Sequence, residues 1–414
     1  MIVIDENRAK KILRFFFFIY MCANMAHKRG YGFDALFCRL SFVLYVGVFF
    51  LLLIKKCIST QIETKSFFLG MSMFSIFYFF SVIWAKDIAS WEDAGIRNSL
   101  FQILLTSCII EMTSDNIHDC KAYLKLYLFS IVYMMIWLVA VTPPSVWGAE
   151  RVGAAMGINS NTVGIRCAVS FILSVYFSSE KGTQKIMYLA IALLSAYISL
   201  FSGSRKAFLI LVIGFIVYWC GKVSGIKRLV RVLLAIIAVA ILLHLVMTND
   251  MLYQVLGRRL ERGFNSFLGD TGRIVDSSSV ERKFYRKYAI SMFYDHPIIG
   301  YGGNGFVGEM QRINYHHIAY SHCNYVELLS TLGIIGFVLY YRIQIGMLVN
   351  SLKQYLKGVA KEKETICVAL AIILTNLFAE YFIVSYYSTS MQTLLVIIFV
   401  TLRFLSEKGG YKKC

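Results

Sequence analysis

One stretch of the chain decides the class of fold. Residues 229–247 read LVRVLLAIIAVAILLHLVM, in which Arg231 and His244 are the ionisable side chains. A helix needs about 20 predominantly apolar residues to cross the hydrocarbon core of a bilayer. The stretch therefore predicts a membrane-spanning helix.

Similar apolar runs occur along the whole chain. Of its 414 residues, 58% are hydrophobic and only 16% are charged, which is enough apolar sequence for about twelve spans. The remaining runs cover residues 12–26, 35–54, 67–84, 98–112, 123–141, 162–178, 186–201, 206–221, 325–341, 365–381 and 389–404. We therefore predict an all-α polytopic membrane protein with about 12 transmembrane helices.

The charge of the chain indicates how it is oriented in the membrane. Lys and Arg outnumber Asp and Glu by 42 to 24, a net charge of +18, which in a soluble protein would suggest a nucleic-acid partner. In a membrane protein, Lys and Arg accumulate in short cytoplasmic loops because they resist translocation. We therefore predict no nucleic-acid partner, and the distribution of cations predicts that both termini are cytoplasmic.

One connection is far longer than the others. About 75 residues separate the ninth and tenth apolar runs, and long loops in membrane proteins are usually functional. The predicted organisation is thus transmembrane helices 1–9 in residues 1–247, a large, partly helical extracytoplasmic loop in 248–324, and transmembrane helices 10–12 with a cytoplasmic tail in 325–414.

The loop contains an amphipathic segment at residues 280–294. Val280, Phe284, Tyr288 and Met292 are spaced four apart and predict one apolar helical face. Two pairs of cations, also spaced by four, follow beside it: Arg282 with Arg286, and Lys283 with Lys287. Such a helix could hold an anionic lipid head group, or simply lie on ordinary phospholipid.

Two further groups could carry chemistry. Residues 202–206 read SGSRK and form a short turn between two spans, where Arg205 could bind a phosphate or anchor the helix end at the interface. His316, His317 and His322 lie close in sequence, but their spacing does not place them on one helical face and no set of zinc ligands is complete, so no metal site is predicted. His322 directly precedes a predicted span and is either an interfacial or a catalytic histidine.

Several short motifs, in order along the chain, resemble those of the O-antigen polymerase and O-antigen ligase superfamily. Residues 202–207 resemble its SGSR turn, residues 278–282 (SSVER) its periplasmic arginine segment, and residues 296–302 (HPIIGYG) its HPxxGxG segment. Residues 321–327 (SHCNYVE), followed by Gly333 and Gly336, resemble the signature in which a histidine precedes two spaced glycines. Asn159 and Asn161 resemble its Asn-rich turn, and Cys323 stands where ligases usually have Asn, Ser or Gln.

The resemblance implies a metal-independent glycosyltransferase that needs no cofactor. Its donor would be a polyprenyl-diphosphate-linked oligosaccharide, used at the extracytoplasmic face of a bacterial cytoplasmic membrane. It implies His322 as the catalytic base and Arg205, Arg282 and Arg286 as ligands of the diphosphate. The implied substrate-lining residues are Asn159, Asn161, Asn324 and Glu327.

The function expected from this resemblance is polymerisation of polysaccharide repeat units, as in O-antigen, capsule or exopolysaccharide. A flippase and a chain-length regulator would be its protein partners. Two alternatives remain open at this point. A ligase would move finished glycan to another acceptor, and a flippase or transporter would place its cations within the spans, where only Arg39, Arg166 and Glu380 look intramembrane.

Overall fold

The computed structural model describes residues 5–27, 33–55, 66–85, 90–147, 152–179, 183–268, 277–313, 315, 320–358 and 362–410. In these ranges the chain forms helices and no β-strand. The helices before the large loop are α1 (Glu6–Ala26), α2 (Phe33–Ile54), α3 (Phe67–Phe80), α4 (Ser90–Thr113), α5 (Ile117–Val141), α6 (Ser160–Ser178), α7 (Lys185–Phe201), α8 (Arg205–Gly221) and α9 (Ile226–Thr248).

The large loop and the C-terminal part are also helical. The loop contains α10 (Asp250–Leu252), the π-helix η4 (Tyr253–Gly257), α11 (Arg258–Leu268), α12 (Ser277–Asp295) and α13 (Gly305–Arg312). The chain then continues through α14 (Asn324–Leu356), α15 (Lys363–Glu380) and α16 (Thr389–Gly410). Each apolar run predicted from the sequence coincides with a helix, apart from a few residues at the ends of runs 67–84 and 365–381, so the all-α class is confirmed.

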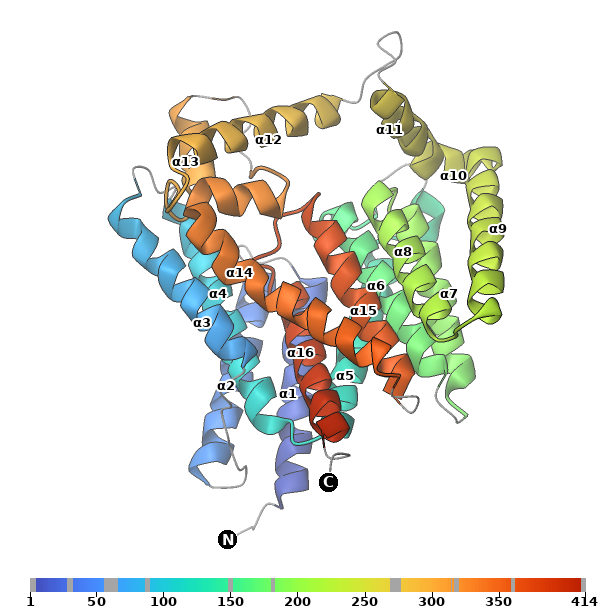
Figure 1. Ribbon diagram of the computed structural model, residues 1–414, viewed down its shortest axis with the longest axis horizontal. Coiled ribbons are helices and arrows are strands. Elements are labelled where there is room, and N and C mark those ends of the chain that lie inside the picture. The colour runs from blue at the N-terminus through green and yellow to red at the C-terminus, as the bar shows by residue number, and fades with distance from the viewer. Residues whose placement is uncertain are drawn as a thin grey trace.

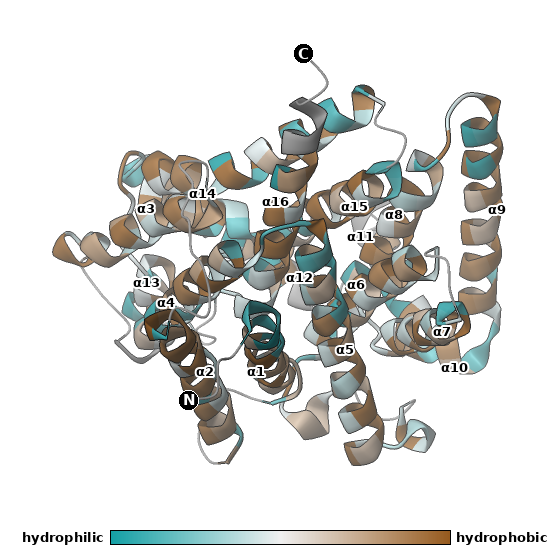
Figure 2. Cartoon of the chain, turned by 90° about the horizontal axis from the view of Figure 1, so that it is seen from below, coloured by the Kyte–Doolittle hydropathy of each residue, from teal (hydrophilic) through white to brown (hydrophobic). Residues whose placement is uncertain are grey.

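Six of the described helices are long and apolar enough to cross a membrane, by length and composition. They are α2, α5, α6, α9, α14 and the part of α16 up to Ser406. Large apolar side chains are exposed on the outward faces of the helices, for example Val43, Leu193 and Ile236, which are 62%, 72% and 59% exposed. Figure 2 shows apolar residues along most of α9, at the edge of the helix array. An exposed apolar surface of this extent fits lipid rather than water, and the protein is a multi-pass membrane protein.

Small and hydroxylated side chains allow the helices to approach closely in the interior. Ser170 on α6 and Ser195 on α7 share a hydrogen bond of 2.8 Å, and the hydroxyl of Ser199 donates to the carbonyl of Gly164 at 3.2 Å. Small residues at helix contacts are typical of membrane proteins, where van der Waals packing and hydrogen bonds drive association.

The helices of the large loop lie at one end of the molecule. In Figure 1, α12 and α11 extend across the top, whereas the N-terminal end of α1 and the C-terminal end of α16 lie near the bottom. The helices of the large loop and the two termini thus lie at opposite ends of the molecule.

The helix α14 is broken near its start. Gly333 has φ 61° and ψ −165°, a conformation outside the helical region that only glycine adopts without strain. The loop after α12 supplies partners for the backbone groups around the break: Ile334 N–H donates to Pro297 O at 2.9 Å and Gly302 N–H donates to Thr331 O at 2.7 Å. Gly300, with φ 66°, packs directly against the backbone of Thr331 and Gly333. The glycine-rich segment, residues 300–305, thus docks onto the broken helix.

The predicted amphipathic helix is confirmed as α12, but its buried face differs from the predicted one. Tyr285 and Ala289, which lie outside the predicted face, are 1% and 0% exposed. Of the predicted face Met292 is buried, whereas Val280 is 56% exposed. The helix α12 packs against α14 through the face that carries Tyr285. As a result, Arg282 and Arg286 are half-buried, whereas Lys283 and Lys287 are exposed. The packing partner, rather than the four-residue repeat, decides which stripe is buried.

Candidate functional site

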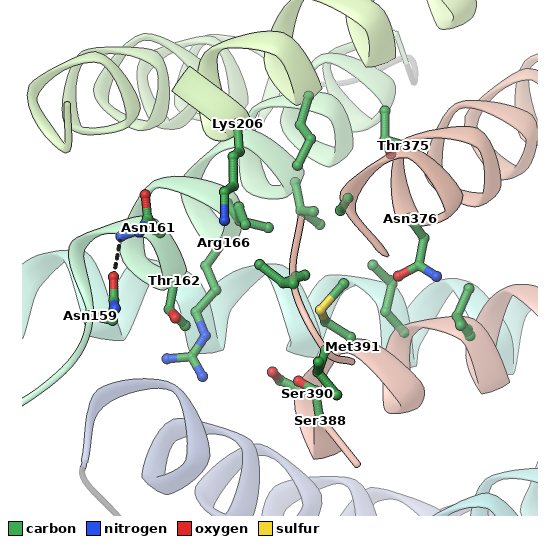
Figure 3. Close-up of a pocket in the computed structure, with 18 of the residues that line it drawn as sticks. Asn159, Asn161, Thr162, Arg166, Lys206, Thr375, Asn376, Ser388, Ser390 and Met391 are labelled. Atoms are coloured by element: carbon green, nitrogen blue, oxygen red, sulfur yellow. Dashed lines mark hydrogen bonds between the residues drawn. The ribbon is translucent and has the colours of Figure 1, made fainter. Parts of the chain in front are cut away.

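A cavity lies between α6, α8, α15 and α16 at the end of the molecule that carries α12. Its volume is about 190 Å³. Figure 3 shows Lys206, Arg166 and Asn161 on one side of it, with Ser388 just before α16 and Ser390 at the start of α16. The polar and ionisable residues that line it are Tyr127, Asn159, Asn161, Thr162, Arg166, Lys206, Arg282, Tyr320, His322, Thr375, Asn376, Ser388 and Ser390. We call it the main cavity.

His322 reaches the main cavity from a tight turn in front of α14. Its backbone has φ 60°, which is uncommon for a residue with a side chain. The carboxylate of Glu327, which is 2% exposed, accepts the N–H of Ser321 at 2.8 Å, and the hydroxyl of Ser321 donates to the carbonyl of Cys323 at 3.0 Å. These bonds on both sides of His322 hold the turn, so Glu327 supports the histidine.

Two tyrosines flank the imidazole. The ring centroids of Tyr320 and His322 are 4.3 Å apart, and Tyr285 from α12 lies 6.0 Å away in a stacked arrangement. The half-buried imidazole is thereby fixed between the loop and α12, with restricted access to water.

Cations from two further elements lie near His322. Arg282 on α12 and Lys206 at the start of α8 both line the main cavity. The ammonium group of Lys206, which is 8% exposed, donates to the carbonyl of Phe382 at 2.6 Å. The guanidinium of Arg286 lies 5.1 Å from the ring centroid of Tyr381, beside the cavity.

Burial and the nearby positive charges both affect the pKa of His322. Burial is the larger cause, Arg282, Lys206 and Arg286 add to it because each disfavours another positive charge nearby, and together they lower the pKa of His322 to about 4. The imidazole is therefore neutral at pH 7 and can accept a proton. An anion bound between the cations would offset their repulsion and raise this pKa.

Arg205 has a different position from its neighbour Lys206. Its guanidinium donates to the carbonyl of Arg259 on α11 at 3.2 Å, and it lies against Gly263 of the same helix. At the start of α8, the residue that lines the main cavity is Lys206. Sequence reasoning selected Arg205 from this turn and missed Lys206, although both cations were visible in it.

The Asn-rich turn before α6 also reaches the main cavity. Both Asn159 and Asn161 line it, and the side-chain oxygen of Asn159 accepts the N–H of Asn161 at 2.9 Å, which caps the helix. Two turns further on, Arg166 lines the same cavity and donates to the carbonyls of Met25 at 2.6 Å and Asn24 at 3.3 Å. Arg166 was not among the predicted site residues, but an arginine inside an apolar run was the signal that could have identified it.

Asn324 supports the site from behind. It is 0% exposed, and its side-chain oxygen accepts the N–H groups of Ser385 at 2.9 Å and Tyr386 at 3.1 Å. The fully buried carboxylate of Glu380 accepts from the hydroxyl of Ser385 at 2.7 Å and from that of Tyr340 at 2.8 Å. Together they hold residues 383–388, several of which line the main cavity, so Asn324 and Glu327 both act on the site through other residues.

His316 and His317 lie outside the described residues. Among the residues that the structure does describe, no group of three or more His, Cys, Asp or Glu side chains is arranged to hold a metal ion.

The fold and the cavity define a polytopic membrane protein with a cationic, histidine-containing site at one end of its helix array. A family model described as O-antigen ligase matches residues 190–341, a range that includes Arg205, Lys206, Arg282, Arg286 and His322. This match confirms the resemblance to the O-antigen polymerase and ligase superfamily. It supports a glycan-processing membrane protein of that type, acting as a glycosyltransferase-like enzyme on a lipid-linked glycan. No curated protein matches the sequence.

Proposed function

We propose that this protein polymerises polysaccharide repeat units. It transfers glycan from a polyprenyl-diphosphate donor to the sugar of a second lipid-linked glycan, at the extracytoplasmic face of a bacterial cytoplasmic membrane. The observation that carries the proposal is that His322, Arg282 and Lys206, which come from separate parts of the chain, line one cavity.

These residues fit the chemistry of sugar transfer from a diphosphate. A hydroxyl oxygen of the acceptor forms a bond to the anomeric carbon of the donor sugar, and the bond from that carbon to the diphosphate oxygen breaks with its electron pair. The proton of the hydroxyl passes to the neutral imidazole of His322. Arg282 and Lys206 offset the negative charge that develops on the diphosphate.

Donor binding should make His322 a stronger base, because nearby positive charges hold its pKa low. Without bound substrate, the pKa of His322 is about 4 and the imidazole is a weak base. A bound diphosphate brings negative charge beside Arg282 and Lys206, so the pKa rises toward neutrality. The base is thus strengthened when the donor is in place.

The remaining predicted residues have supporting roles in this proposal. Arg286, next to the main cavity, adds to the positive potential at the diphosphate. Arg205 would reach the diphosphate only by leaving the carbonyl of Arg259, so we assign the contact at this turn to Lys206. Asn159 and Asn161 would contact sugar hydroxyls. The cations supply the charge that a magnesium ion supplies in many reactions of phosphates, and the proposed reaction needs no metal or cofactor.

Ligase activity is the second candidate, because the matching family model is described as O-antigen ligase. A ligase would use the same donor, the same base and the same cations. Cys323 supports the polymerase, since ligases of the superfamily that the sequence resembles usually have Asn, Ser or Gln at this position. In the cell, a flippase would supply the donor and a chain-length regulator would act on the product.

Reconstitution tests the proposal. Purified protein in proteoliposomes receives the lipid-linked repeat unit as the sole substrate, with and without a chelator. A ladder of polymer in both conditions is the expected result. A ladder that requires a separate acceptor would identify a ligase, and activity that is lost on chelation and restored by a divalent ion would contradict the metal-free mechanism.

A further inference from the structure

A second cavity of about 370 Å³ adjoins the main cavity. The two cavities share five lining residues: Asn159, Arg166, Val384, Ser388 and Ser390. The second cavity extends from these to the C-terminal end of α1 and to Ser99 on α4. It therefore continues the site into a region that the proposed chemistry does not use.

The second cavity differs from the main one in its chemistry. Asn24, Asn159, Ser99 and Thr389 bring amide and hydroxyl groups to its wall. Amides and hydroxyls both donate and accept hydrogen bonds, as the hydroxyls of a sugar do. Apart from Arg166, which both cavities share, none of its lining residues is a Lys, Arg, Asp or Glu. The lining suits a neutral ligand with many hydroxyl groups better than a phosphate.

The wall formed by α1 is held rigidly. His27 contacts the carboxylate of Asp34 through Nδ1 at 2.8 Å and the hydroxyl of Tyr133 through Nε2 at 3.2 Å. Because both ring nitrogens are engaged, His27 fixes the shape of the wall and is not placed as a second base. The hydrogen bonds from Arg166 to Asn24 and Met25 hold the same end of α1 against α6. A wall that is fixed before binding lowers the entropic cost of recognising a ligand.

We propose that the second cavity binds sugar residues of the lipid-linked glycan, while the main cavity holds the diphosphate and the reacting hydroxyl. This inference rests on the proposed function, because a transferase for lipid-linked glycans must position sugars next to the diphosphate. The volume of the second cavity falls within the range of about 300–1,000 Å³ that is typical of small-molecule sites.

A filling substitution tests this assignment. Ser99 is 7% exposed and lines the second cavity but not the main one, so Ser99→Leu removes a hydroxyl and occupies space there. The matched control is Cys108→Leu, on the same helix and outside the lining of both cavities. Each variant is placed in nanodiscs, and its affinity is measured for undecaprenyl diphosphate and for undecaprenyl diphosphate carrying the repeat unit.

We expect wild-type protein to bind the glycan-bearing lipid more tightly than the bare lipid. In Ser99→Leu, the affinity for the glycan-bearing lipid should fall by about tenfold or more, as expected where hydroxyl recognition is lost. Its affinity for bare undecaprenyl diphosphate should stay at the wild-type value, and Cys108→Leu should bind both lipids as the wild type does. Unchanged affinity of Ser99→Leu for the glycan-bearing lipid would overturn the proposal. Failure of wild-type protein to bind either lipid would instead count against the proposed function.

A second measurement needs no variant and so does not depend on the folding of Ser99→Leu. Hydrogen exchange of wild-type protein should slow in the peptides around Ser99 and His27 when the glycan-bearing lipid is added, but not with the bare lipid. The same glycan on a lipid monophosphate keeps its acceptor hydroxyls and lacks the leaving diphosphate. If the glycan on a lipid monophosphate also slows hydrogen exchange in these peptides, the second cavity binds the acceptor glycan. If only the glycan on the lipid diphosphate slows it, the second cavity binds the donor glycan. Absence of slowing with both glycan-bearing forms would overturn the proposal.

Discussion

The carboxylate of Glu327 accepts the backbone N–H of Ser321 at 2.8 Å and so fixes the turn that carries His322. The turn holds His322 at φ 60°, a conformation that costs about 1–3 kcal/mol and persists only when its surroundings impose it. Glu327 is therefore a positioning residue for the proposed base.

Removing this carboxylate should lower turnover more than binding. In Glu327→Ala, we expect kcat to fall by about tenfold or more because the imidazole loses its fixed geometry. The affinity for undecaprenyl diphosphate should stay within about twofold of the wild type, since Glu327 does not line the main cavity. Glu327→Gln keeps an acceptor oxygen and should restore most of the turnover. Wild-type turnover of Glu327→Ala in proteoliposomes would show that Glu327 does not position His322 for catalysis.

The two cations of the main cavity should govern donor affinity. Arg282→Met and Lys206→Met should each weaken binding of undecaprenyl diphosphate by about ten- to a hundredfold, because a hydrogen bond to a charged group contributes about 1.5–3 kcal/mol. Lys283→Met is the matched control, since Lys283 neighbours Arg282 and is exposed on the outer face of α12. Wild-type affinity in Arg282→Met, or an equal loss in Lys283→Met, would contradict the assignment.

The pH dependence of activity should report the cations around His322. Activity falls as pH decreases through the pKa of the base, and kcat/KM reports the free enzyme. Because the pKa of His322 is lowered to about 4, the acid limb of kcat/KM should lie well below pH 6.5 in wild-type protein.

Arg286→Gln should move this limb to higher pH. The substitution removes one of the positive charges that disfavour the imidazolium, so the pKa of His322 rises. Lys287→Gln, which changes an exposed cation on the same helix, should leave the limb in place. An acid limb that does not move in Arg286→Gln would show that His322 does not set it.

The break in α14 should be essential for stability. A Cβ at Gly333 would collide with the backbone of Ile298 and Ile299, and the positive φ is itself unfavourable for alanine. Gly333→Ala should therefore lower the melting temperature of the detergent-solubilised protein by several degrees, since 1 kcal/mol already corresponds to about 2–4 °C in a domain of about 150–250 residues. Gly346→Ala, on the same helix with open space at the Cβ position, should not lower it. Equal melting temperatures for the two variants would contradict the described docking of the glycine-rich segment.

The helices could be predicted because an apolar run is a local property of the sequence. The end of α12 was also predictable, since Asp295 and His296 are followed by Pro297 and a residue before proline avoids helical geometry. The resemblance then selected His322 and Arg282, which line the same cavity.

Other features depend on contacts that are distant in sequence. Arg205 and Lys206 are adjacent, and consecutive residues of a helix point about 100° apart, so the residue that faces the cavity depends on how α8 packs. Asn324 was predicted to line the substrate site, but it binds the backbone of Ser385 and Tyr386, about sixty residues further on. The break at Gly333 likewise depends on the loop that contains Gly300.

The central claim is that His322 accepts the proton of the acceptor hydroxyl. The most direct test compares His322→Ala with wild-type protein in proteoliposomes supplied with the purified lipid-linked repeat unit, with binding of undecaprenyl diphosphate measured in parallel. His316→Ala and His317→Ala serve as controls that the mechanism does not require. The mechanism predicts that His322→Ala lowers turnover by about a hundredfold or more and leaves donor affinity within about twofold of the wild type. Wild-type turnover in His322→Ala, or a loss of donor binding that accounts for the lost activity, would contradict it.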